Sequence, residues 1–107
     1  MKVSILFIFI SLFQSSVFAS NECTTTEGQV IATVTRVETD SMIFCKAYIS
    51  IKSISHYSAH MICPLSIDSV VEEGIIFPLV NGHDCEVYVG DSISGYLLSN
   101  GKSIYLD

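Results

Sequence analysis

Residues 42–52 read MIFCKAYISIK, with apolar side chains at every second position. Side chains of a β-strand alternate between its two faces, so this pattern predicts a strand with one apolar face. That face comprises Ile43, Cys45, Ala47, Ile49 and Ile51. The opposite face carries the rings of Phe44 and Tyr48 together with two lysines. We therefore expect a core strand whose outer surface is aromatic and basic.

Residues 58–63 follow a turn near Ile54 and are predicted to form a hairpin with residues 42–52. A hairpin centred at this turn places the apolar residues of both strands on one face. In the same register, Tyr48 lies opposite His60 on the outer face. The agreement between pattern and register favours this hairpin.

Two further segments, 29–37 and 85–89, alternate apolar and polar residues and are predicted to be strands, and residues 93–106 are predicted to form a hairpin. The last contains Asn100-Gly101, a pair typical of two-residue hairpin turns. A turn of that length would place Leu97 opposite Ile104. We expect the chain to end in this hairpin.

Residues 66–75 carry apolar side chains at helical spacing, with Ser66 as a suitable N-cap and Gly74 as a suitable end. The element order is thus three strands, a short helix, and two or three strands. It predicts a mainly β fold with one short helix, a small OB-like five-stranded barrel stapled by disulfides. A small open meander with one helix is the alternative.

Residues 1–19 have the parts of a secretory signal: Lys2, the apolar run 5–12, and Val17-Phe18-Ala19 before a cleavage site. The apolar run is shorter than the roughly 20 residues of a spanning helix. We therefore expect cleavage after Ala19 and no membrane span afterwards. Residues 20–107 are then expected to form one domain, secreted or periplasmic.

The expected mature chain contains four basic and eleven acidic residues, a net charge of −7. Nucleic acids and anionic membrane surfaces attract clustered lysines and arginines. The charge balance therefore predicts that neither is a partner.

The four cysteines are typical of two disulfides, because an even number in a short exported chain is the usual pattern. The hairpin register favours a bridge between Cys45 and Cys63, which leaves Cys23 to join Cys85. Four cysteines permit three pairings, so the other two stay open. The gaps of 22, 18 and 22 residues lack the close pairs of zinc sites, and we expect no metal site.

A ligand face is predicted on the outer side of the central hairpin. Aromatic rings on an OB-type sheet can stack on a sugar or pack against a protein partner. The candidate residues are Phe44, Tyr48, Ser50 and His60. The alternative is that the rest of the barrel, or the helix, covers these rings.

Gly90-Asp91-Ser92-Ile93 is similar to the nucleophile block of the GDSL hydrolases. That family places the block near the start of a larger domain, with Asp and His partners near its end. No histidine follows Ser92 here, so the serine would lack its base. His56 and His60 would be about 13 Å apart along a strand, too far to share one metal ion. We expect no catalytic residues and no cofactor.

Val30-Ile31, Phe44-Cys45 and Cys63 after a hairpin are similar to the first half of the binding subunits of pertussis-like toxins, over residues 28–65. Those subunits are small exported OB-fold chains with a hairpin disulfide, and they assemble as pentamers that bind sialylated or other glycans. The resemblance implies a candidate glycan-binding strip of Tyr48, Ser50 and His60. The helix here is shorter than in that family, and the chain ends soon after the last hairpin.

Together these features predict an exported, non-enzymatic binding module, either monomeric or a homo-oligomer, with a protein or glycan ligand. A carbohydrate-binding subunit of the toxin type is one alternative. A small secreted hydrolase that uses Ser92 is another, and an inhibitor of a secreted enzyme is a third.

Overall fold

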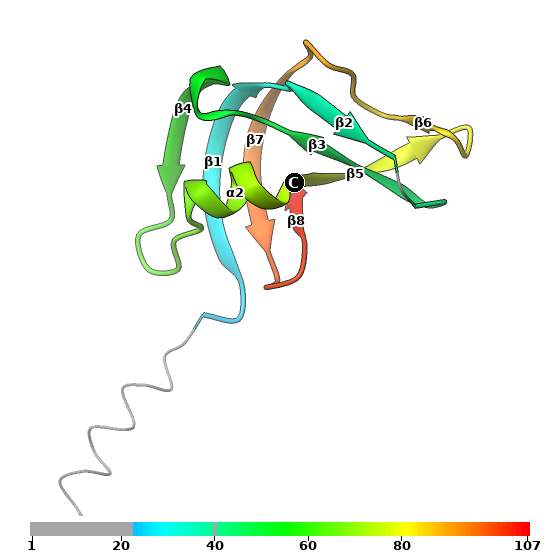
Figure 1. Cartoon of the computed structure of the whole chain (residues 1–107). Coiled ribbons are helices and arrows are strands. Elements are labelled where there is room, and N and C mark those ends of the chain that lie inside the picture. The colour runs from blue at the N-terminus through cyan, green and yellow to red at the C-terminus, as the bar shows by residue number, and fades with distance from the viewer. Residues whose placement is uncertain (1–22, 40) are drawn as a thin grey trace, which may run out of the picture.

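The computed structural model describes residues 23–39 and 41–107, so the expected signal segment lies outside the described residues. The fold is mainly β with one short α-helix, as the sequence predicts (Figure 1). In chain order, the elements are β1 (Thr26–Thr33), β2 (Arg36–Glu38), β3 (Phe44–Tyr48), the 3₁₀-helix η1 (Ile51–Ser53), β4 (Ile54–Ala59), α2 (Ile67–Glu73), β5 (Ile75–Val80), β6 (Asp84–Cys85), β7 (Ser92–Ser99) and β8 (Ile104–Leu106).

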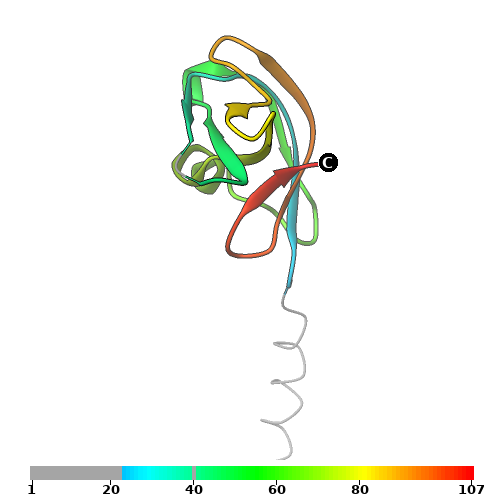
Figure 2. The same ribbon diagram turned by 90° about the vertical axis from the view of Figure 1, so that its right-hand side faces the viewer.

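The strands form one curled sheet that resembles half of a barrel. The strand order is β2-β3-β5-β8-β7-β1-β4, and β6 pairs with β5 off this path. Only Val34 and Thr35 separate β1 from β2 in the chain, although these strands lie near opposite ends of the order. The sheet must therefore curl, and in Figure 2 its strands curve around a common centre. The Val34 N–H donates to the Asp91 carbonyl oxygen at 2.9 Å and the Thr35 N–H to that of Tyr48 at 2.8 Å, which fixes the corner.

The inner face of the curled sheet forms the apolar core. Val30, Ala32 and Val34 are at most 2% exposed, which confirms the face predicted for this strand. The helix contributes Val70, which is fully buried. The other large side chains that are almost fully buried come from β5, β7, β8 and the residue directly after β3: Ile49, Ile75, Leu97 and Ile104. Burial of this apolar surface is the main contribution to the stability of the fold.

The helix α2 has the ends that the sequence predicts. The Ser66 hydroxyl accepts the Asp68 N–H at 3.2 Å, which satisfies one of the unpaired donors of the first turn. Gly74 ends the helix with φ of 80° and ψ of 170°, a conformation that is essentially restricted to glycine. The helix therefore stops where the chain enters β5.

The predicted hairpin between residues 42–52 and 58–63 is wrong. The strand β3 stops at Tyr48, and η1 turns the chain before β4 begins. The Ser53 side chain holds this turn, because its hydroxyl accepts the Ser50 N–H at 3.0 Å and donates to the Ser50 carbonyl oxygen at 2.9 Å. As a result β4 pairs with β1, while β3 lies between β2 and β5.

All four cysteines are in disulfides, as predicted, but the predicted pairing is wrong. The bonds are Cys23–Cys63 and Cys45–Cys85, with Cα atoms 5.6 and 5.7 Å apart. Since β4 is not the neighbour of β3, Cys63 does not face Cys45. Cys85 does reach Cys45, because β5 pairs with both β3 and β6.

The C-terminal hairpin is present, but with a different register from the predicted one. Leu97 pairs with Leu106 instead of Ile104. The Asn100 side chain accounts for this shift, since its Oδ1 accepts the N–H groups of Lys102 and Ser103 at 2.9 Å each and so organises a longer loop. The shift is an even number of residues, so the inner and outer faces are unchanged.

Tyr57 on β4 anchors the segment between β4 and α2. Its hydroxyl donates to the Leu65 carbonyl oxygen at 2.5 Å. Burial raises the pKa of Tyr57 above its ordinary value of 10.0. An unfolded chain loses tyrosine protons near pH 10, while folded Tyr57 keeps its proton there. We therefore expect the contribution of this group to be constant below pH 10 and to be lost as the pH rises towards the folded pKa.

Urea denaturation at several values between about pH 8 and pH 11 tests this expectation. The Tyr57→Phe variant should lose stability less steeply with rising pH than the wild type. It should keep a residual slope from Tyr96, whose pKa is raised by burial and by the neighbouring Glu27. Equal slopes for the two proteins would contradict the assignment to Tyr57.

Candidate ligand-binding groove

The outer face of β3, β5 and β8 brings together residues from three distant parts of the chain. Lys46 on β3 is paired with Ile76 on β5, which in turn is paired with Tyr105 on β8. On the same face, two residues away along each strand, Phe44 is paired with Pro78. Because side chains alternate, these residues lie opposite the buried Cys45, Ala47, Ile75 and Phe77. Core packing on one face therefore positions an apolar row on the other.

A cleft of about 570 Å³ lies over this face, and we call it the apolar groove. Its volume is within the range of about 300–1,000 Å³ that is usual for small-molecule sites. Ile43 and Tyr105 in its wall are 74% and 43% exposed. The apolar lining residues are Ile43, Phe44, Phe77, Pro78, Tyr105 and Leu106, with Ile76 at the centre of the row. Glu86 and Ser103 are its polar residues.

A smaller cleft of about 140 Å³ adjoins the apolar groove, and we call it the polar pocket. The linings of the two clefts share Ile76 and Ser103, so the clefts are neighbours on the sheet. Lys46 and Lys102 line the polar pocket from the sheet side and the final hairpin. Glu72, Glu73 and Gly74 line it from the end of α2, and Tyr48 completes it.

Tyr48 is held on several sides within this pocket. The Arg36 guanidinium lies 3.8 Å from the centroid of its ring, and its hydroxyl donates to Glu38 Oε1 at 3.1 Å. Arg36 and Glu38 also form an ion pair. Gly74 packs so closely that an added Cβ atom would lie 2.9 Å from the Tyr48 ring. The end of α2 thus covers part of this ring, which matches the alternative considered from the sequence.

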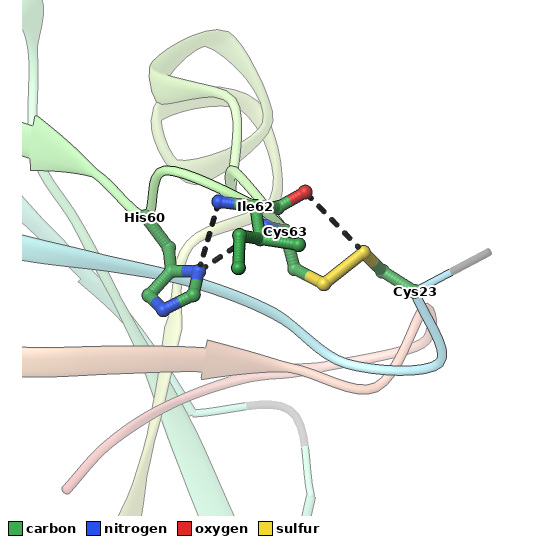
Figure 3. Close-up of a disulfide and its surroundings, with 4 residues drawn as sticks. All are labelled: Cys23, His60, Ile62 and Cys63. Atoms are coloured by element: carbon green, nitrogen blue, oxygen red, sulfur yellow. Dashed lines mark hydrogen bonds between the residues drawn. A yellow bond between two sulfur atoms is a disulfide. The ribbon is translucent and has the colours of Figure 1, made fainter. Parts of the chain in front are cut away.

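Ser50 and His60 lie elsewhere. Ser50 belongs to the turn at η1. His60 lies beside the Cys23–Cys63 disulfide, where its Nδ1 accepts the N–H groups of Ile62 and Cys63 at 3.3 and 3.1 Å (Figure 3). The four predicted ligand residues therefore do not form one strip, because the hairpin that would join His60 to Tyr48 is absent. Of the four, Phe44 lines the apolar groove.

The predicted strip omits Ile76, Pro78 and Tyr105, which form much of the groove. The apolar run IIFPLV at residues 75–80 indicates a strand, but in the sequence Pro78 was considered only as a limit on the preceding helix. Pro78 lies within β5, and its carbonyl oxygen accepts the Glu86 N–H at 3.2 Å.

The segment around Ser92 is organised as a turn. The Asp91 carboxylate accepts the Tyr88 N–H at 2.8 Å, and the Gly90 N–H donates to the Val34 carbonyl oxygen at 2.8 Å. Ser92 is exposed at the start of β7 and is paired with Thr33. Across residues 23–39 and 41–107, no three His, Cys, Asp or Glu side chains gather as a metal site.

Comparison with known proteins gives no match to a family model, to a curated protein or to a solved structure. No helix in the described part of the chain has the length and hydropathy needed to span a bilayer. The case for function therefore depends on the geometry of the groove.

Proposed function

We propose that the chain is an exported, non-enzymatic binding module that holds its ligand in the apolar groove over β3, β5 and β8. The single observation that supports this most is the continuous apolar surface left exposed on three adjacent strands. Contiguous apolar patches on soluble proteins usually mark interaction sites or ligand grooves. A groove of this volume, with Glu86 and Ser103 as polar residues in its lining, has the composition expected for such a site.

We further propose that the curled sheet is an elaborated OB-like barrel. With β1 and β2 taken as one bent strand, the order β1/β2-β3-β5-β8-β7 returns to β1, and β4 and β6 are additions. The parallel pairing of β5 with β8, among otherwise antiparallel neighbours, supports this reading. OB-folds bind ligands on the face of their second and third strands, which here are β3 and β5.

The proposed compartment is extracellular or periplasmic. Both disulfides support it, because such bonds persist in oxidising compartments. The signal-like composition of residues 1–19 points the same way.

Fluorescence titration with the neutral apolar probe N-phenyl-1-naphthylamine tests the proposed site. The probe should bind the wild type saturably and lose most of its enhancement with Tyr105→Ser, because this ring forms a wall of the groove. Tyr88→Ser is the matched control, since Tyr88 is 61% exposed and lies outside the groove. Equal loss in both variants, or no binding to the wild type, would reject the site.

A carbohydrate-binding subunit of the toxin type is the second candidate. The polar pocket favours it, because lysines, carboxylates and a serine hydroxyl can form hydrogen bonds with a sugar. Light scattering should then show a ring of subunits, and a glycan array should give a signal that Lys46→Gln weakens. A monomer without any glycan signal would remove this candidate.

A further inference from the structure

The charged residues around the apolar groove lie mostly in the adjoining polar pocket. Lys46, Lys102, Glu72 and Glu73 line that pocket. Glu86 is the charged residue in the lining of the groove itself. An elongated occupant that reaches the polar pocket would therefore meet two ammonium groups and two carboxylates there.

The two lysines are available to a ligand. Within residues 23–39 and 41–107, the ion pairs closer than 4.0 Å are Arg36–Glu38 and His83–Asp84. Lys46 and Lys102 belong to neither pair. Glu72, Glu73 and Lys102 in the same pocket are exposed, so solvent screens all three more than it screens the half-buried Lys46.

The two lysines of the polar pocket contrast with the negative net charge of the protein. The expected mature protein carries a net charge of −7, with only four basic side chains. Two of these four line the polar pocket. An anionic group approaching the surface is repelled in general, and the half-buried Lys46 is the least screened charge that lines this pocket.

We propose that the groove binds one free long-chain carboxylate, with the alkyl chain along Phe44, Ile76 and Tyr105 and the carboxylate between Lys46 and Lys102. This inference rests on the proposed binding function of the groove and adds the ligand class. The apolar row removes the alkyl chain from water, and the ammonium groups provide charge-assisted hydrogen bonds to the carboxylate.

Isothermal titration calorimetry compares three ten-carbon amphiphiles: decanoate and decyltrimethylammonium below their critical micelle concentrations, and 1-decanol below its solubility limit. Decanoate should bind with one site per chain and about tenfold more tightly than the alcohol, which should bind more tightly than the cationic amphiphile. Higher salt should weaken only the decanoate advantage. Equal affinities for the three amphiphiles would overturn the proposal.

Variants separate the head group from the chain. Lys46→Gln with Lys102→Gln should weaken decanoate about tenfold and leave 1-decanol unchanged. Lys52→Gln is the matched control, because Lys52 lies on η1 and lines neither cleft. An unchanged decanoate affinity in the double variant would overturn the proposal.

Two further outcomes have defined meanings. If 1-decanol and N-phenyl-1-naphthylamine bind the groove but the double variant has no effect, the ligand class is wrong and the binding function stands. If neither probe binds, both the proposed ligand class and the proposed binding function are wrong. Binding to phosphatidylglycerol vesicles without binding to free decanoate would assign the lysines to a membrane surface and overturn the proposal.

Discussion

Replacement of both Cys45 and Cys85 by alanine is expected to lower the free energy of unfolding by about 2–5 kcal/mol. This disulfide joins β3 to β6 across the intervening β5 and closes a separation of 40 residues. Cys45 and Cys85 are 0% and 6% exposed, so their removal also leaves a gap in the core. Urea denaturation monitored by circular dichroism measures the change.

The matched control is replacement of both Cys23 and Cys63 by alanine. That bond also has a separation of 40 residues, so the chain-entropy contribution of the two bonds should be similar. Neither Cys23 nor Cys63 is fully buried, so their replacement should cost less. A larger loss for the Cys23/Cys63 variant would contradict the placement of Cys45–Cys85 in the core.

Leu97→Ala is expected to lower the free energy of unfolding by about 2–5 kcal/mol, the usual cost of a cavity in a packed core. Leu97 is 0% exposed, and on β7 it lies between Gly28 on β1 and Leu106 on β8. The curled sheet packs around this position, which limits how far it can collapse into the cavity. Thermal and urea denaturation should both show that Leu97→Ala is less stable than the wild type.

Leu98→Ala provides the comparison for this variant. Leu98 is the next residue along β7, points to the opposite face by alternation and is only partly buried. Its replacement should cost about 1 kcal/mol or less. If the two alanine variants lost the same stability, the assignment of Leu97 to the core would be wrong.

Local features of the fold could be predicted from the sequence. Ser66 and Gly74 bound the helix because capping depends on neighbouring residues alone. The alternation around Val30 and Ala32 identified the buried face, since side-chain period is a property of the strand itself.

The neighbours of each strand were not predictable in the same way. Alternation shows which face of β3 is apolar, but it does not show whether β4 or β5 pairs with it. A turn held by the Ser53 side chain redirected β4 to β1. The disulfide pairing failed for the same reason, because it was inferred from the assumed neighbour of Cys45.

The candidate site was predicted only in part. Phe44 was identified because the outer face of its own strand was visible in the sequence. Ile76 and Tyr105 were missed because they join Phe44 through β5 and β8, which are distant in the chain. A binding face assembled from three such strands depends on the strand order, which the residue pattern leaves open.

The most direct test of the groove as the binding face is a map of amide chemical shifts during titration with N-phenyl-1-naphthylamine. Our account predicts the largest changes at Phe44, Ile76 and Tyr105. It predicts little change at the exposed Met61 and Ile62, which lie beside the Cys23–Cys63 disulfide. Changes centred on Met61 and Ile62, or spread evenly over the protein, would contradict it.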